Sequence, residues 1–193
     1  MRTLFISLGV LGLSISTIQA QAQFINILPP PPMTKLESFD TNTEVVILKA
    51  STDVGSISAD SGVVAVKSKE MTDTSTGHKE QGIALEITPR GQARAVLLID
   101  FDEIPSLVAA IDYINKLDVT VTPLTSFDAA YTTKGGFRIA ALGTRNTGAV
   151  QFGVRDARTS STPSTPVTFS RDQMTRLSDL INQAKSILDS LRR

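Results

Sequence analysis

Two segments of this chain carry the apolar spacing of an amphipathic helix, and each follows a block of strand-forming residues. In the first segment Ile104, Leu107 and Ile111 recur at intervals of three and four, and the second repeats this spacing from Met174 to Leu191. Each helix has to bury its apolar stripe against another element, and the strands upstream supply apolar surface. The pattern predicts an α+β fold: antiparallel sheet in two blocks of about four strands, each block followed by one amphipathic helix.

Short runs of β-branched or alternating apolar residues predict the strands of the first block, at 44–48, 54–58, 63–67, 83–87 and 95–99. The polar stretch 70–81 is typical of a long loop or a hairpin tip. Pro105 is tolerated only near the start of a helix, which favours Asp102 as the N-cap and makes Pro105 the third helical residue.

The second block has the same kinds of signal, with strands expected at 127–133, 137–142, 148–155 and 167–169. Lys134-Gly135-Gly136 predicts a tight hairpin turn, because glycine adopts the positive backbone angles that such turns require. Ser170, with Gln173 three residues on, is typical of a capping box at the start of the closing helix. We expect that helix to pack on its own sheet; a seam for a partner helix is the alternative.

The two halves align at an offset of 70 residues, with Leu107 over Leu177 and Ile111 over Ile181. The alignment defines possible pseudo-repeat halves, 43–118 and 127–191. Few aligned positions are identical, so the sequence leaves open whether this tandem repeat of four strands and a helix arose by duplication.

This order of elements resembles the tandem four-strand-plus-helix plan of Whirly, PC4-like and PUR-type single-stranded nucleic-acid binders. The resemblance covers element order over about residues 43–191, without the signature motifs of those families. It implies an open sheet face that binds single strands. The near-neutral charge and the scarcity of aromatic residues argue against a nucleic-acid ligand, since such binders need a basic groove and stacking rings.

Residues 1–22 have the layout of a cleavable signal peptide. One positive charge precedes an apolar run from Leu4 to Ile18, and Ala20-Gln21-Ala22 is a small-x-small cleavage site. The run is shorter than the roughly 20 apolar residues of a membrane span, which makes an uncleaved anchor the weaker alternative. We therefore expect a secreted or periplasmic protein, cleaved between Ala22 and Gln23, with no transmembrane segment afterwards.

After the leader, Pro29–Pro32 predicts an extended, proline-rich N-terminal spacer over 23–42, with an irregular lead-in at 33–42. A single α+β domain is expected over 43–193. The chain contains no cysteine, which excludes thiol catalysis, thiolate metal sites and disulfides.

Few residues are candidates for chemistry. His78 is the only histidine; Ser75 and Asp73 lie near it in sequence, but a loop of neighbours seldom holds a triad, and a solvated loop histidine is the simpler interpretation. The acidic residues Asp100, Asp102 and Glu103 lie where a helix begins, as helix-capping residues do. A calcium site or a glycosidase pair are the alternatives. We expect no cofactor and no metal.

The leading hypothesis is an exported, non-catalytic binding or envelope-associated protein whose partner is an unknown protein or small ligand. A carboxylate-dependent exported hydrolase, with or without the assistance of a metal, is one alternative, and single-strand binding by the open sheet face is another. Around the glycine hairpin, Tyr131, Lys134 and Arg138 are the candidate ligand or partner surface.

We expect mass spectrometry of the exported chain to find Gln23 at its N-terminus. Ala22→Tyr removes the small side chain required before the cleaved bond and is expected to leave the leader attached. Gln21→Tyr is the matched control, because the position between the two small residues accepts larger side chains. Unchanged processing of Ala22→Tyr would contradict the assignment.

Overall fold

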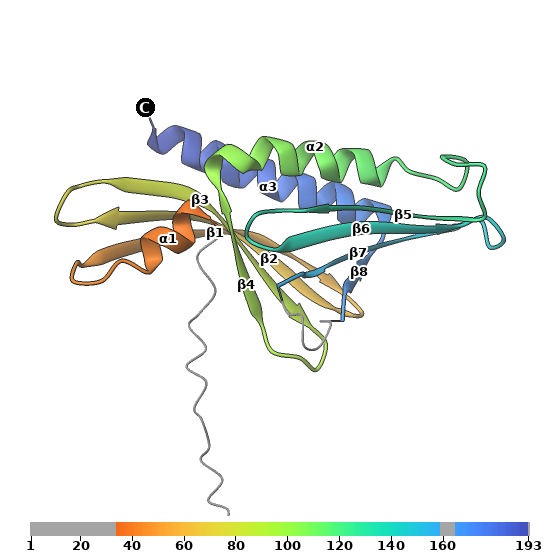
Figure 1. The fold of residues 1–193 in the computed structure, drawn as a ribbon, viewed down its shortest axis with the longest axis horizontal. Coiled ribbons are helices and arrows are strands. Elements are labelled where there is room, and N and C mark those ends of the chain that lie inside the picture. The colour runs from red at the N-terminus through yellow and green to blue at the C-terminus, as the bar shows by residue number, and fades with distance from the viewer. Residues whose placement is uncertain (1–33, 159–164, 193) are drawn as a thin grey trace, which may run out of the picture. The chain divides into compact units, whose positions relative to one another are not determined.

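The computed structural model describes residues 34–158 and 165–192 (Figure 1). The predicted signal peptide, the proline run and residues 159–164 lie outside the described residues. Two antiparallel four-stranded sheets, each followed by a helix, confirm the α+β prediction. The first sheet contains β1 (Ile47–Ala59), β2 (Gly62–Asp73), β3 (Lys79–Pro89) and β4 (Ala95–Asp100), in that spatial order. The second contains β5 (Ser126–Thr132), β6 (Phe137–Thr144), β7 (Ala149–Asp156) and β8 (Val167–Phe169), also in order.

The strands of the first sheet are longer than the sequence predicts. The end of the expected run 44–48 and the whole of the run 54–58 belong to one strand, β1, which begins at Ile47 and has an irregularity in its register between Asp53 and Gly55. The polar stretch 70–81 belongs largely to β2 and β3, so it is a hairpin tip rather than a long loop. Its polar residues pair across the strands: Lys79 Nζ lies 2.8 Å from Glu70 Oε1. Polar pairing hides these strands from a search for apolar alternation.

Helix α1 (Lys35–Asp40) forms where an irregular lead-in was expected. Thr34 caps it in a capping box with Glu37, and Leu36 is fully buried. Leu36 packs in a second apolar cluster with Phe39, Met71, Ala84 and Leu98. With six residues, α1 is too short for helical periodicity to reveal it.

The acidic residues after β4 differ from expectation in what they cap. A single 3-10 turn, η1 (Phe101–Glu103), precedes α2 (Ile104–Asn115), so Asp102 is not the N-cap and Pro105 is the second helical residue. Asp100 instead accepts the backbone N–H groups of Lys35 and Leu36 at 2.9 and 3.2 Å. The first backbone N–H groups of α1, which have no partner within the helix, therefore donate to the carboxylate of Asp100. The sequence pattern instead predicted this carboxylate at the start of α2.

The closing helix α3 (Arg171–Leu191) begins as the sequence predicts. Ser170 Oγ accepts from the Gln173 N–H at 3.2 Å, and Gln173 Oε1 accepts from the Ser170 N–H at 2.8 Å, which confirms the capping box. The hairpin turn between β5 and β6 is confirmed as well, with Gly136 at a φ of 84°.

The two helices exchange sheets. α3 follows the second sheet but lies on β1, β2 and β3, while α2 follows the first sheet and lies on β5 and β6. The Ser68 hydroxyl of β2 donates to the Ala184 carbonyl of α3 at 3.1 Å. The expectation that the closing helix packs on its own sheet was therefore wrong. Both sheets present similar apolar surfaces, so the apolar stripe of α3 does not by itself identify which sheet the helix covers.

The helices also contact each other, and both lie on the same side of the sheets (Figure 1). Ser178 of α3 donates to Asp112 of α2 at 2.9 Å. The main core lies between the helix pair and the inner faces of the sheets. This placement leaves the opposite faces of both sheets without either long helix.

The crossed packing predicts an energetic coupling between β1 and α3. A Cβ at Gly55 would lie 2.7 Å from Leu180 Cδ2. Gly55→Ala therefore overpacks the contact, at a cost of roughly 1–3 kcal/mol, and Leu180→Ala empties it, at roughly 2–5 kcal/mol. In urea unfolding, we expect the free energy of unfolding of the double variant to fall by at least about 0.5 kcal/mol less than the sum of the losses in the two single variants.

The control pair combines Gly55→Ala with Leu191→Ala, because Leu191 is on the same helix but 58% exposed. Those two changes are expected to add. Additivity of Gly55→Ala with Leu180→Ala would contradict the placement of α3 on β1.

Candidate functional site

Strict alternation in β6 and β7 gives the second sheet two different faces. The face toward the helices is buried and apolar and includes Phe137, Ile139, Ala141, Phe152 and Val154. Alternate residues point the other way, since successive side chains of a strand project to opposite faces. We call the side of this sheet away from α2 and α3 the outer face; it carries Asp128, Arg138, Ala140, Leu142, Gln151, Gly153 and Arg155.

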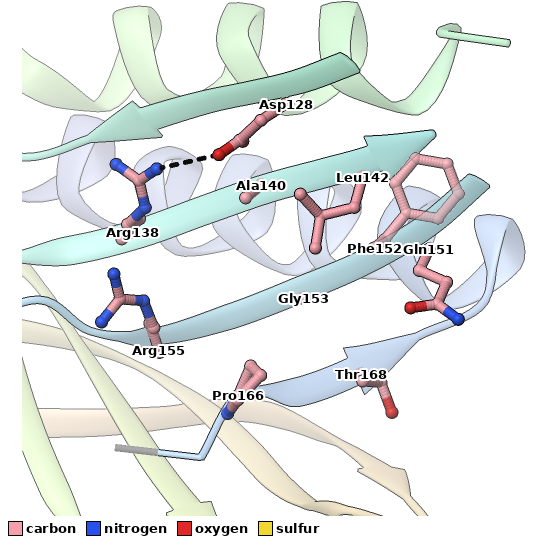
Figure 2. A pocket seen from close by; sticks show the side chains of 10 residues that line it. All are labelled: Asp128, Arg138, Ala140, Leu142, Gln151, Phe152, Gly153, Arg155, Pro166 and Thr168. Atoms are coloured by element: carbon pink, nitrogen blue, oxygen red, sulfur yellow. Dashed lines mark ion pairs between the residues drawn. The ribbon is translucent and has the colours of Figure 1, made fainter. Parts of the chain in front are cut away.

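The outer face is hollowed. A shallow groove of about 240 Å³ runs over β6, β7 and β8, as Figure 2 shows. Its lining combines charged, small and apolar residues from four strands and the segment before β8: Asp128, Arg138, Ala140, Leu142, Gln151, Phe152, Gly153, Arg155, Pro166 and Thr168. We call this the outer-face groove.

Two arginines form the charged end of the outer-face groove. Arg138 and Arg155 are direct partners in the β6–β7 register, which places like charges opposite each other. Arg138 Nη2 lies 3.9 Å from Asp128 Oδ2, at the outer limit of an ion pair, and Arg138 Nη1 donates to Thr132 Oγ1 at 3.4 Å. No acid among the described residues pairs with Arg155. The groove thus has excess positive charge at one end.

The three residues predicted around the glycine hairpin do not share a surface. Arg138 lines the outer-face groove, whereas Tyr131 is half-buried on the opposite face and packs against the main core. Lys134 is exposed in the turn, where its backbone N–H donates to Glu103 Oε1 at 2.9 Å. The structure therefore associates Tyr131 and Lys134 with Glu103, and Arg138 with Arg155.

Burial raises the pKa of Tyr131 above its ordinary value, and the negative charge of Glu103 raises it further. Glu103 is itself 9% exposed, and its Oε2 has no hydrogen-bond partner. This side chain ties the β5–β6 turn to the start of α2.

Sequence reasoning missed Arg155. The signal was present, because Gly148, at a φ of 65°, closes a short turn between β6 and β7 and thereby fixes their register. Counting outward from that turn pairs position 138 with position 155. The prediction treated the two strands separately and so did not bring the arginines together.

His78 lies at the tip of the β2–β3 hairpin, with its side chain 61% exposed and Nε2 3.2 Å from Glu80 Oε1. The Ser75 hydroxyl donates to Asp73 Oδ1 at 2.6 Å, the main cause of a lowered Asp73 pKa. Ser75 is thus hydrogen-bonded to the aspartate and not to the histidine. In a catalytic triad the histidine stands between the serine and the acid, so this arrangement is not a triad.

Over residues 34–158 and 165–192, no three His, Asp or Glu side chains gather in a way that could hold a metal ion. Within the same ranges, no helix has the length and apolar character needed to cross a bilayer.

No protein-family model matches this chain, and no curated protein matches it either. Among solved structures it is similar to the crystal structure of WHY1 from Arabidopsis thaliana, with a TM-score of 0.35 and 13% sequence identity. The match covers 70% of this chain and 89% of that one. A likeness at this level decides neither fold nor function.

The contact between Glu103 and the β5–β6 hairpin can be tested by titration. In a Tyr113→Phe background Tyr131 is the only tyrosine, and we expect its phenol to ionise above 10.0 in an ultraviolet pH titration. Glu103→Gln removes the negative charge and is expected to lower the Tyr131 pKa. The pKa should not return fully to its ordinary value, because the burial of Tyr131 remains. Asp102→Asn is the matched control and should leave it unchanged; equal shifts in both variants would contradict the assignment.

Proposed function

We propose that this chain is an exported, non-catalytic binding protein that holds an anionic ligand on the outer face of its second sheet. The observation that carries the proposal is the pairing of Arg138 with Arg155, of which Arg155 has no acidic partner among the described residues. Export rests on the predicted leader, residues 1–22.

Like charges directly opposite each other on neighbouring strands destabilise a sheet. An oxyanion between the two guanidinium groups would turn this repulsion into attraction, because arginine presents a planar set of donors that matches carboxylate and phosphate oxygens. The first sheet is a useful contrast. On its corresponding face, Lys67 Nζ lies 3.1 Å from Asp53 and 3.3 Å from Glu86, so that positive charge is balanced within the chain.

The groove lining favours binding over the two alternatives. Hydrolysis by paired carboxylates needs two acids at one site, and Asp128 is the only acid among the residues that line this groove. Single-strand binding uses exposed rings for base stacking. Phe152, the only aromatic residue of the lining, is 3% exposed.

Inorganic phosphate is a simple probe of the proposed site. We expect NMR titration of the ¹⁵N-labelled protein, at ionic strength held constant with chloride, to shift the amides around Gly153 and Arg155 in a saturable way. Arg155→Gln is expected to weaken this binding about tenfold, the effect of losing charge-assisted hydrogen bonds.

Arg94→Gln is the matched control, because Arg94 is exposed directly before β4 and already pairs with Glu86 at 3.1 Å. This variant should bind phosphate like the wild type. Shifts spread over all basic side chains, or an Arg155→Gln variant that titrates like the wild type, would overturn the proposal.

A further inference from the structure

The outer-face groove changes from charged to apolar along the strands. Three cross-strand rows follow one another from β6 to β7: Arg138 with Arg155, Ala140 with Gly153, and Leu142 with Gln151. Four residues along a strand separate the first row from the third, a distance of about 13 Å. A ligand seated here therefore meets two arginines at one end and small or apolar side chains along the middle of the groove. Asp128 and Gln151 flank Leu142 on its two sides at the other end.

The middle row forms the floor of the groove. Gly153 does not have a positive φ, so its backbone does not require glycine. A Cβ at Gly153 would lie 3.3 Å from Pro166 Cβ, so a larger side chain would fill the space between β7 and Pro166. Ala140 and Gly153 thus keep a channel open beside the proline ring (Figure 2).

Leu142 stands at the far end of this channel and is 53% exposed. An exposed leucine beside a small-residue floor would gain contact with an apolar chain laid along the strand. Pro166, also exposed, forms the side wall. The apolar part of the groove therefore suits a narrow, unbranched chain.

The sheet face also selects against a peptide as the occupant. The backbone groups of β6 and β7 under the groove are engaged in ladder pairing with each other and with their outer neighbours. A peptide laid over Ala140 and Gly153 would leave its own N–H and C=O groups without partners against an apolar floor. An alkyl chain has no such groups.

We infer that the ligand class is a straight-chain alkyl carboxylate. Its carboxylate lies between the guanidinium groups of Arg138 and Arg155, and its chain runs over Ala140 and Gly153 toward Leu142. This inference rests on the proposed anion-binding function and names its substrate class. Gly153 is the residue that determines specificity, because it admits the chain.

Decanoate is the probe, since its extended chain matches a span of about 13 Å. We expect calorimetry below the micelle concentration to show decanoate binding at least about a hundredfold tighter than acetate, because several methylene groups are buried. Decanol, which has the chain without the charge, should bind at least about tenfold more weakly than decanoate.

Three variants divide the contributions. Arg155→Gln is expected to weaken both decanoate and acetate to a similar degree, whereas Gly153→Val should reduce the ratio of decanoate affinity to acetate affinity at least about tenfold. Leu142→Ser, at an exposed position that does not threaten folding, is expected to lower the same ratio several-fold.

The outcomes separate the two proposals. If phosphate binding depends on Arg155 but decanoate binds no tighter than acetate, the ligand class is wrong and the anion site stands. If neither anion depends on Arg155, the proposed function itself fails. A leucine-terminated peptide carboxylate that binds as tightly as decanoate would overturn the alkyl-chain inference.

Discussion

The fold depends on the exchange of helices between the two sheets. Because α3 covers β1 to β3 and α2 covers β5 and β6, neither block of strands can bury its inner face without the other half of the chain. The contact between the helices, such as the hydrogen bond from Ser178 to Asp112, closes this arrangement. The halves that the sequence suggests are consequently not independent units. The same packing places both long helices on one side of the sheets, so neither long helix covers the outer faces.

The two outer faces are used differently. On the first sheet, α1 buries Leu36 and Phe39 against the strands, and ion pairs balance the remaining charge around Lys67. The side chain of Lys67 forms hydrogen bonds with Asp53 and Glu86, and these bonds, the one with Asp53 most of all, raise the pKa of Lys67. On the second sheet, Arg155 has no such balance among the described residues. Because Arg155 lies directly opposite Arg138, the pair costs stability within the chain, and this contrast is the support for our proposal of an anion from outside it.

Periodicity made the main architecture predictable. The two helix stripes, the glycine turn and the capping box of Ser170 all depend on local spacing, and the structure confirms them. Three features depend on contacts between distant residues, and local patterns do not contain them. Asp100 caps α1 across 65 residues, α3 lies on the sheet of the other block, and Arg155 meets Arg138 through strand register. Of the predicted surface, only Arg138 lines the groove. Lys134 lies in the turn, and the alternation of β5 points Tyr131 toward the core instead.

The central claim is that the outer-face groove holds an anionic ligand in the exported space. The most direct measurement is mass spectrometry of small molecules that copurify with the chain from its native host, compared between the wild type and an Arg138→Gln, Arg155→Gln double variant. The account predicts a bound organic anion in the wild type that is absent from the double variant. Equal small-molecule content in both, with both folded, would contradict it.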